Sequence, residues 1–280
     1  MSVASTNFQD EESARGGYRA PAAEKVLDIL EFMATQPDGL TQTEISTGLG
    51  RSIHEIYRIL LLLEKRGYLI RTKADRLILS LKVFELAHKH PPVNRLVESA
   101  LPAMRELALQ TDQGCHLAVL KDLLVLVVLQ IDSPLPMHYS VALGSQFPAL
   151  ETSSGAVLLA GLSCEDRDRT IGRIVAADQA IGTRAEIDAR LDAATTCGYE
   201  MRPSLAVQGC TNISLPVRNH TGAMVAALTV PFLPQKAARF DAEAVFGHAV
   251  AAAARISGAL GATELPVITP RGGAPVTDGE

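Results

Sequence analysis

Two capping boxes stand eleven positions apart in the N-terminal third of the chain, and they fix where two helices begin. The first is Thr-Gln-Thr-Glu at residues 41–44, and the second is Ser-Ile-His-Glu at residues 52–55. In a capping box the hydroxyl accepts from the amide three residues later, and the glutamate reaches back to the N-cap. The first helix ends near Gly48, so only a tight turn fits before the second. This spacing is typical of a helix-turn-helix.

Further helical and strand-like segments surround these two helices. An amphipathic helix follows Pro21 and ends at the Pro-Asp-Gly run 37–39; its apolar positions are Val26, Ile29, Leu30 and Met33. The second capped helix ends at Gly67, and its inward stripe is Ile56, Ile59, Leu60 and Leu63. Two strand-like runs then form a hairpin with a polar tip, at residues 68–71 and 77–80. Together these elements predict a winged helix-turn-helix domain over residues 20–90.

The charge of the chain is unevenly distributed. Residues 1–50 hold 3 basic and 8 acidic side chains, and residues 91–280 hold 14 and 19. Residues 51–89 reverse this balance with 9 basic and 4 acidic side chains, although the whole chain carries −5. A short basic segment in an acidic protein can bind a polyanion that the rest of the chain would repel.

The polar side chains of the motif are placed to read duplex DNA. The helix that begins at Ser52 fits the major groove, where we expect Arg58 to bond a guanine and Glu55 to accept from a cytosine. We expect the wing and the preceding helix to hold phosphates. The predicted DNA-binding residues are Thr41, Gln42, Arg51, Ser52, His54, Glu55, Arg58, Arg71, Lys73 and Arg76. Such modules also serve in protein docking or dimerisation, which stays open. Leu61 and Leu62 fall outside the inward stripe and are expected to pack against another element.

The rest of the chain mixes helices and strands without regular alternation. A helical connector is expected over 93–110, with Pro102 in the first turn of a new helix. Predicted strands are 115–120, 123–131, 137–143, 212–218 and 223–231, and predicted helices are 153–162, 164–176, 184–196 and 236–260. This order predicts an α+β fold with an antiparallel sheet. Residues 1–19 and 263–280 are expected to be a disordered arm and tail.

Composition excludes several classes of protein. With 47% hydrophobic and 20% charged residues, the 280-residue chain is globular rather than collagenous or wholly disordered. Only 4% of residues are aromatic, with no tryptophan, which argues against a base-stacking platform for single strands. No apolar run is long enough for a membrane span, and no secretory signal is seen. The four widely spaced cysteines favour reduced thiols in a cytoplasmic protein.

Taken together, these segments resemble the isocitrate-lyase-regulator (IclR) type of transcription factor. The runs that carry the resemblance are residues 41–45, 57–60, 63–68, 152–160, 209–217 and 226–230, and it extends over about residues 20–262. It implies a DNA-binding domain at 20–90, a connector helix at 91–110 and a GAF-like effector domain at 111–262. It also implies homodimers or tetramers on palindromic operators, and a small organic acid or aromatic metabolite as effector.

The resemblance also assigns ligand-binding residues to the second domain. They are Ser153, Ser154 and Gly155 at a helix start, Asn212, Ser214 and Thr229 on strands, and Arg202 in a loop that covers the pocket. A helix N-terminus suits an anion, and an arginine fork suits a carboxylate. The alternative is that the serines only cap their helix and that Arg202 is solvated. Two positions depart from the family: Ala156 where many relatives have lysine, and Asn212 where cysteine is frequent.

Three other functions compete with that of a ligand-responsive regulator. One is an enzyme acting on a small acid with a DNA-binding appendage, but no acid–base constellation accompanies the motifs. A second is a redox sensor using Cys115 and Cys210, whose apolar strand surroundings favour inert thiols. A third is metal binding by His116 and His138 on strands, which lack further ligands at suitable spacing. We therefore expect no catalytic residues, no metal and no cofactor.

Overall fold

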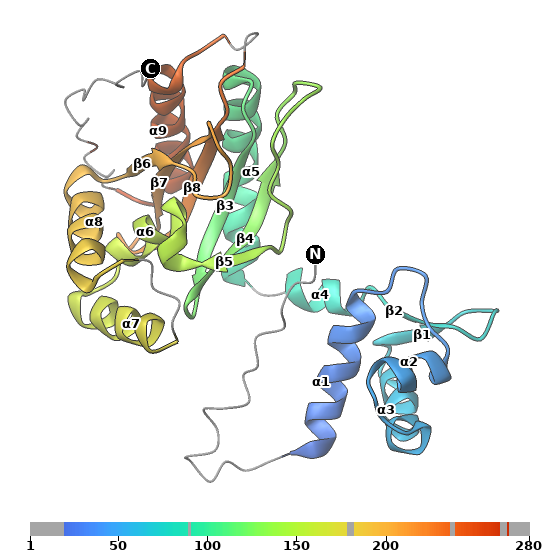
Figure 1. Ribbon diagram of the computed structural model, residues 1–280. Helices are drawn as coiled ribbons and strands as arrows, with labels where there is room; N and C mark the ends of the chain where they lie inside the picture. Colours follow the sequence, from blue (N-terminus) through green and yellow to red (C-terminus); the bar gives the residue numbers. More distant parts are fainter. Residues whose placement is uncertain (1–19, 89–90, 178–181, 236–238, 264–267, 269–280) are drawn as a thin grey trace. The chain divides into compact units, whose positions relative to one another are not determined.

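The computed structural model describes residues 20–88, 91–177, 182–235, 239–263 and 268. The chain divides between residues 90 and 91 into two compact units, called unit 1 and unit 2 below. Figure 1 shows the helices and strands of each unit. Within the described residues, no helix combines the length and the apolar character needed to cross a membrane.

Unit 1 has the order of elements that the sequence predicts as far as the hairpin, followed by a short helix that the sequence does not predict. Its elements are α1 (Pro21–Ala34), α2 (Gln42–Gly48), α3 (Ile53–Lys65), β1 (Leu69–Arg71), β2 (Leu77–Leu79) and α4 (Lys82–His88). Both capping boxes form: the Thr41 amide donates to Glu44 Oε2 at 2.7 Å, and the Ser52 amide donates to Glu55 Oε2 at 3.0 Å. The core is one apolar cluster drawn from the three helices and the hairpin, comprising Ile29, Met33, Ile45, Ile56, Leu60, Leu63, Leu69 and Leu77.

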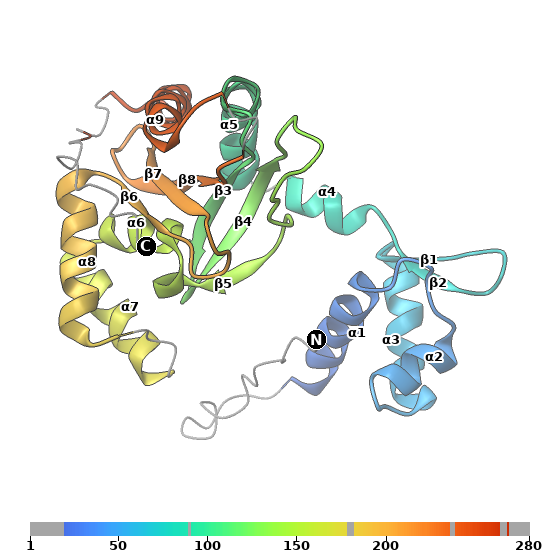
Figure 2. The ribbon, with the colours of Figure 1, turned by 45° about the horizontal axis from the view of Figure 1, so that its top comes forward.

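The hairpin of unit 1 is the predicted wing. Strands β1 and β2 pair antiparallel, Leu40 adds an isolated bridge to Leu77, and the tip projects from the unit in both views (Figures 1 and 2). Gly39 has a φ of +67° and lies against the Leu77 carbonyl, where a Cβ would approach the oxygen to 2.6 Å. Two expectations for this unit were wrong: Leu61 and Leu62 are 44% and 49% exposed rather than packed on another element, and α4 was not foreseen.

Unit 2 is built on one six-stranded antiparallel sheet with the strand order β5-β4-β3-β8-β7-β6. Its strands are β3 (Cys115–Lys121), β4 (Leu124–Ile131), β5 (Gln146–Pro148), β6 (Glu200–Pro203), β7 (Thr211–Arg218) and β8 (Met224–Phe232). Its helices are α5 (Pro91–Thr111), the short 3-10 helix η2 (Ala149–Glu151), α6 (Ser153–Ala160), α7 (Cys164–Ala176), α8 (Arg184–Cys197) and α9 (Ala242–Ala259). The α+β class with an antiparallel sheet is confirmed.

Helices cover both faces of this sheet. Helices α5 and α9 lie side by side on one face, and α6 lies on the other with α7 and α8 beyond it (Figures 1 and 2). The strands alternate accordingly: Leu215 and Leu228 join the core under α5 and α9, whereas Ala118 and Ala227 join the core under α6. Side chains on the α6 face therefore set the chemistry of any site between the sheet and that helix.

Four details of unit 2 correct the sequence expectations. Pro102 lies inside a continuous α5 instead of starting a new helix, because buried Ala100, Ala103 and Met104 pack both halves into the core. Helix α5 is thus part of unit 2 rather than a separate connector.

Residues 137–143 form no strand, and the strand found nearby is β5. Residues 201–204, expected as an irregular loop over the pocket, instead lie largely in the edge strand β6. The first predicted residues of α9, 236–238, lie outside the described residues, as do 1–19 and most of 263–280.

Candidate functional site

A row of polar residues crosses the α6 face of the sheet. In the strand registers His116 of β3 lies opposite Thr229 of β8, and Thr229 lies opposite Ser214 of β7. The hydroxyls of Ser214 and Thr229 are 2.7 Å apart and hydrogen-bonded, and both residues are buried. Polar side chains inside a sheet–helix core need partners, so this row marks a special place on the sheet.

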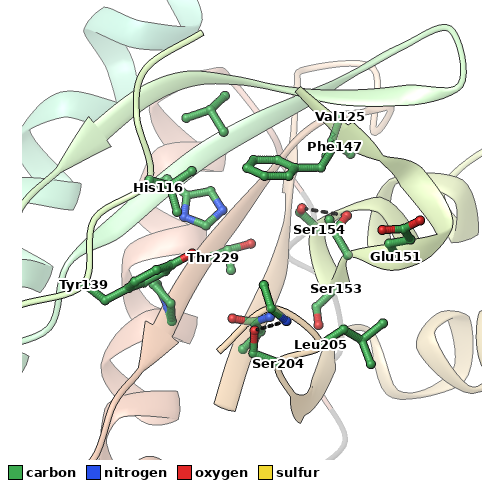
Figure 3. A pocket seen from close by; sticks show the side chains of 16 residues that line it. His116, Val125, Tyr139, Phe147, Glu151, Ser153, Ser154, Ser204, Leu205 and Thr229 are labelled. Atoms are coloured by element: carbon green, nitrogen blue, oxygen red, sulfur yellow. Dashed lines mark hydrogen bonds between the residues drawn. The ribbon is translucent and has the colours of Figure 1, made fainter. Parts of the chain in front are cut away.

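A cavity of about 200 Å³ opens between this row and the start of α6. Figure 3 shows His116 and Tyr139 on one side of the cavity, and Glu151, Ser153 and Ser154 on the other. The lining residues come from the strands, the loop after β4, the start of α6 and the loop after β6; they are His116, Val125, Val127, Tyr139, Val141, Phe147, Glu151, Thr152, Ser153, Ser154, Ser204, Leu205, Ala206, Asn212, Thr229 and Pro231.

The cavity includes some of the predicted ligand residues and excludes others. Ser153, Ser154, Asn212 and Thr229 line it. Ser214 lies behind Thr229, fully buried. Gly155 packs so closely on η2 that a Cβ would overlap the Ala149 carbonyl, so its role there is structural. Arg202 is on β6 opposite Asn212 and is not a lining residue, which corrects the expectation of a covering loop and an arginine at the ligand.

His116 is the most unusual residue of the cavity. It is 9% exposed, its Nδ1 is enclosed without a hydrogen-bond partner, and no described residue bonds its Nε2. Burial lowers the pKa of the imidazole from 6.5 to about 4, because the charged form would lose its hydration. The ring is therefore neutral at pH 7, with one donor and one acceptor nitrogen and no protein group to satisfy either.

The start of α6 forms the opposite wall. Thr152 is the N-cap, and its Oγ1 accepts from the Gly155 amide at 2.9 Å. Ser154 Oγ donates to Thr152 Oγ1 at 3.3 Å, whereas Ser153 Oγ is enclosed and has no partner among the described residues. The first amides of a helix have no intrahelical acceptor and carry the positive end of its dipole. This wall suits an anionic or acceptor group.

An ion pair fixes this wall to the rest of the unit. Arg190 of α8 donates to both carboxylate oxygens of Glu200 on β6, at 2.6 and 2.7 Å. The same guanidinium donates to the carbonyls of Leu150 and Thr152, the latter at 2.9 Å. The side chains of Arg190 and Glu200 are only 19% and 10% exposed. Arg190 thus holds the segment before α6 against the strand that leads into the Ser204–Ala206 wall.

Several lining residues were missed by sequence reasoning. Residues 137–143 alternate as a strand would, and Tyr139 and Val141 do point to one side, but that side is the cavity rather than a sheet partner. Met137 and Leu143 of the same segment are 80% and 68% exposed. His138, expected on a strand with His116, lies in this segment and its Nδ1 is 3.0 Å from the Leu135 carbonyl oxygen. Among the described residues no group of His, Cys, Asp and Glu could hold a metal ion.

The two cysteines considered as redox sensors, Cys115 and Cys210, are poorly suited to react with an oxidant. Burial raises the pKa of the Cys115 thiol to about 12, and burial raises the pKa of Cys210 as well. The Cys115 thiol donates to the Met104 carbonyl at 3.5 Å. Both thiols are therefore protonated at neutral pH, and the reactive thiolate is scarce.

In unit 1, the start of α3 is tied to α1 by two ion pairs. Arg51 donates to Asp28 at 2.6 Å, and Lys25 donates to Glu55 Oε1 at 3.0 Å. The Ser52 amide and Lys25 together lower the pKa of Glu55 to about 2. Both oxygens of Glu55 are thus engaged within the protein, which differs from the expected role of reading a cytosine. His54 and Arg58, one helical turn apart, are exposed and have no ion-pair partner in the described part of the chain.

Among the described residues, two cations of the wing have ion-pair partners and one has none. Arg71 donates to Glu64 at 2.8 Å and to Asp75 at 2.7 Å. Arg76 donates to the Gly39 carbonyl at 2.9 Å and pairs with Glu44 at 3.1 Å, so it holds the wing to the loop before α2. Lys73 at the tip is exposed without an ion-pair partner among described residues. Thr41 and Gln42 are half-buried at the start of α2, and Ser52 is exposed.

Two family models match the two units. The model for the IclR helix-turn-helix domain matches residues 22–72, and the model for the bacterial transcriptional regulator IclR C-terminal region matches residues 92–258. Among curated relatives, the HTH-type transcriptional regulator KdgR of Dickeya chrysanthemi is 27% identical over 212 residues, which cover 74% of this chain and 69% of that protein. XynR of Escherichia coli (strain K12) is 24% identical over 219 residues, 77% of this chain and 87% of that one.

Solved structures share the fold. An IclR homologue from Microbacterium hydrocarbonoxydans complexed with 4-hydroxybenzoate gives a TM-score of 0.70 at 23% identity, covering 85% of this chain and 98% of that one. The IclR of Thermotoga maritima gives 0.65 at 20% identity, with the same coverage of both chains. The resemblance seen in the sequence is thereby confirmed. The chain, with its DNA-binding helix-turn-helix, belongs to the IclR family of bacterial transcriptional regulators.

Proposed function

We propose that this regulator binds a palindromic operator as a homodimer or tetramer, and that a small organic acid or aromatic metabolite in the unit 2 cavity sets its operator affinity. The observation that carries the proposal is the cavity, whose walls hold an imidazole and a serine hydroxyl that lack protein partners. Buried polar groups without partners cost free energy, and a ligand that pairs them recovers it.

The size and chemistry of the cavity support this class of ligand. An engineered cavity of about 150 Å³ in another protein accommodates benzene, so a cavity of about 200 Å³ has room for a substituted ring or a short chain. Phe147, Val125 and Val127 give apolar walls, and the start of α6 gives amides for an acid group. The Microbacterium relative of the same fold was solved with 4-hydroxybenzoate, an aromatic acid of this size class.

The exposed groups of unit 1 support different roles for different residues: some contact DNA, and others hold the motif together. Arg58 and His54 are free to reach base edges when α3 lies in the major groove. We infer that exposed Lys73 on the wing and half-buried Thr41 and Gln42 at the start of α2 contact phosphates. Arg51, Glu55, Arg71 and Arg76 instead shape the motif through their ion pairs. Ser52 is the N-cap of α3 and is exposed.

Two measurements on the full chain test the proposal. Selection from a random duplex library should return a palindromic sequence, and the affinity for it should fall steeply as salt rises, because phosphate contacts release counterions. A thermal-shift screen of small carboxylic, sugar and aromatic acids should return a binder, which at 100 times its Kd stabilises the protein by about 2.7 kcal/mol. Duplexes without a shared sequence, or a screen without any binder, would contradict the corresponding half of the proposal.

A further inference from the structure

The outward face of α3 carries apolar side chains beside its polar ones. Helical spacing places His54, Tyr57, Arg58 and Leu61 on one stripe, because they stand at i, i+3, i+4 and i+7. The buried positions of α3 join the core of unit 1 on the opposite side of the helix. Tyr57 is 46% exposed and Leu61 is 44% exposed. Half of this outward stripe is therefore apolar surface in contact with solvent.

Ion pairs show which way the two edges of α3 face. Glu64 is seven residues after Tyr57, two turns along the same side, and it accepts from the wing arginine at 2.8 Å. Glu55 is seven residues before Leu62, on the other edge of the helix, and it accepts from the α1 lysine at 3.0 Å. Tyr57 therefore lies on the wing side of the outward stripe, whereas Leu62 lies on the α1 side, outside it.

The fold leaves α3 few groups that could read bases through hydrogen bonds. Arg51 and Glu55, at its start, are engaged by α1. Within the described part of the chain, His54 and Arg58 are the residues of the outward stripe that are polar, exposed and without an ion-pair partner. The rest of the stripe is a tyrosine ring and a leucine side chain. The apolar group that bases present in the major groove is the C5 methyl of thymine.

The spacing of the two apolar side chains fits separate base pairs. Leu61 lies about one turn along the helix from Tyr57, which is about 5.4 Å, and base pairs are stacked about 3.4 Å apart. With α3 in the major groove, the two side chains reach base pairs one or two steps from each other. Arg58 follows Tyr57 directly in the sequence, so its base is a near neighbour of both.

We propose that the ring of Tyr57 and the side chain of Leu61 contact thymine methyl groups in each half-site, close to the base that Arg58 bonds, and that these two residues select thymine there. This inference rests on the proposed function, since it concerns the same operator. Contact removes apolar surface of both partners from water, which is favourable without any hydrogen bond. Uracil has the hydrogen-bonding groups of thymine but no methyl, so it should be the poorer base at these positions.

Deoxyuridine replacement tests this with the unaltered full-length protein. The probe is the operator selected from the random duplex library, with one thymine position at a time replaced by deoxyuridine in both half-sites. Fluorescence anisotropy measures each Kd. We expect binding to weaken about ten-fold at one or two positions of the half-site, since two buried methyl groups are lost in each replacement. Thymines outside the half-sites should show no effect.

Four variants then locate the methyl contacts. Each deoxyuridine penalty should disappear in Tyr57→Ala or in Leu61→Ala, whereas Tyr57→Phe keeps the ring and should keep the penalty. The matched control is Leu62→Ala, because Leu62 is 49% exposed but lies outside the outward stripe. It should retain every penalty in full. A penalty that survives in both alanine variants of the stripe, or that Leu62→Ala removes equally, would overturn the inference.

The same experiment separates this inference from the proposed function. An operator that is selected and bound, but whose Kd is unchanged by every deoxyuridine replacement, overturns the methyl contacts and leaves operator binding standing. If the selection returns no shared sequence, the operator half of the proposed function fails and this inference fails with it.

Discussion

The two sites of this protein are assembled in opposite ways. The side chains of unit 1 that we propose to hydrogen-bond bases and a phosphate at the wing, His54 and Arg58 on α3 and Lys73 on the wing, come from one short stretch and are exposed. The cavity of unit 2 collects residues from 116 to 231, drawn from strands, loops and a helix start, and its decisive groups are buried. A surface site can thus be read from local periodicity, whereas a cavity depends on which strands become neighbours.

The two sites also differ in how far their charged and polar groups are paired and buried. In unit 1 four of the predicted DNA-binding residues already form ion pairs, namely Arg51, Glu55, Arg71 and Arg76, so few free charges remain. In unit 2 the polar atoms of His116 and Ser153 are enclosed and unpaired. Salt therefore acts on the first site through screening, and burial governs the second through desolvation.

The largest effect is expected from the ion pair that holds the cavity wall. Arg190→Ala leaves the buried Glu200 carboxylate without its partner, which should lower the free energy of unfolding of unit 2 by about 3–5 kcal/mol. The matched control is Arg184→Ala on the same helix, whose exposed pair with Asp188 at 2.8 Å is worth about 0–1 kcal/mol. Chemical denaturation measures both. Equal losses would mean that Arg190 is only a surface charge.

The two units should unfold in separate transitions. Leu60 is fully buried in unit 1 and its neighbour Leu61 is 44% exposed. Leu60→Ala should destabilise unit 1 by about 2–5 kcal/mol and leave acid binding by unit 2 intact, whereas Leu61→Ala should cost a few tenths of a kcal/mol. Differential scanning calorimetry with and without acid distinguishes the two transitions. A single transition that shifts as a whole would show that the units unfold together.

The free energy of unfolding should depend on pH in the range where the buried imidazole of His116 titrates differently in the folded and unfolded chains. Its folded pKa of about 4 lies below the 6.5 of an exposed imidazole, so between these values the unfolded chain binds a proton that the folded chain does not. The free energy of unfolding should therefore fall by up to about 3 kcal/mol as pH drops from 6.5 towards 4, and be unaffected by this group above 6.5. His116→Asn should remove that slope. Ser153→Ala, which alters the same cavity without a titrating group, should keep it.

The smallest effects concern DNA recognition. Arg58→Ala should cost about 1–3 kcal/mol on the selected operator and little on unrelated duplex, because a base-edge contact is lost. Lys73→Ala should weaken binding to all duplexes alike and reduce the slope of log affinity against log salt by about 0.9. Fluorescence anisotropy over a salt series measures both variants. Indistinguishable profiles would assign Arg58 to the phosphate backbone.

Local chemistry made unit 1 largely predictable. Capping boxes, helical spacing and the turn residues each point to one structure, and both boxes form as expected. What sequence could not show was pairing at a distance: Glu55 is engaged by Lys25, thirty positions earlier, and Arg76 by the Gly39 carbonyl. Charged residues were therefore counted as free when the fold had already paired them.

In unit 2 the elements were more predictable than the cavity. Most helices and strands lie close to their predicted ranges, because each has a clear period. Pro102 was misjudged because packing on both sides of it outweighs the lost hydrogen bond. The family resemblance assigns Arg202 to a loop over the ligand, but the residue belongs to the edge strand β6 and does not line the cavity. The sequence alone does not show that His116 lies in the cavity, because this depends on the strand registers, which set it between Thr229 and Gln130.

We propose that occupation of the unit 2 cavity changes how unit 1 binds its operator. The direct measurement is the operator Kd of the full-length protein, with and without a saturating acid identified in the screen. We expect a 5–150-fold change in this Kd, the range that a coupling of about 1–3 kcal/mol produces. An acid that binds at the cavity and an operator that binds at α3, with a Kd that is the same in both conditions, would contradict it.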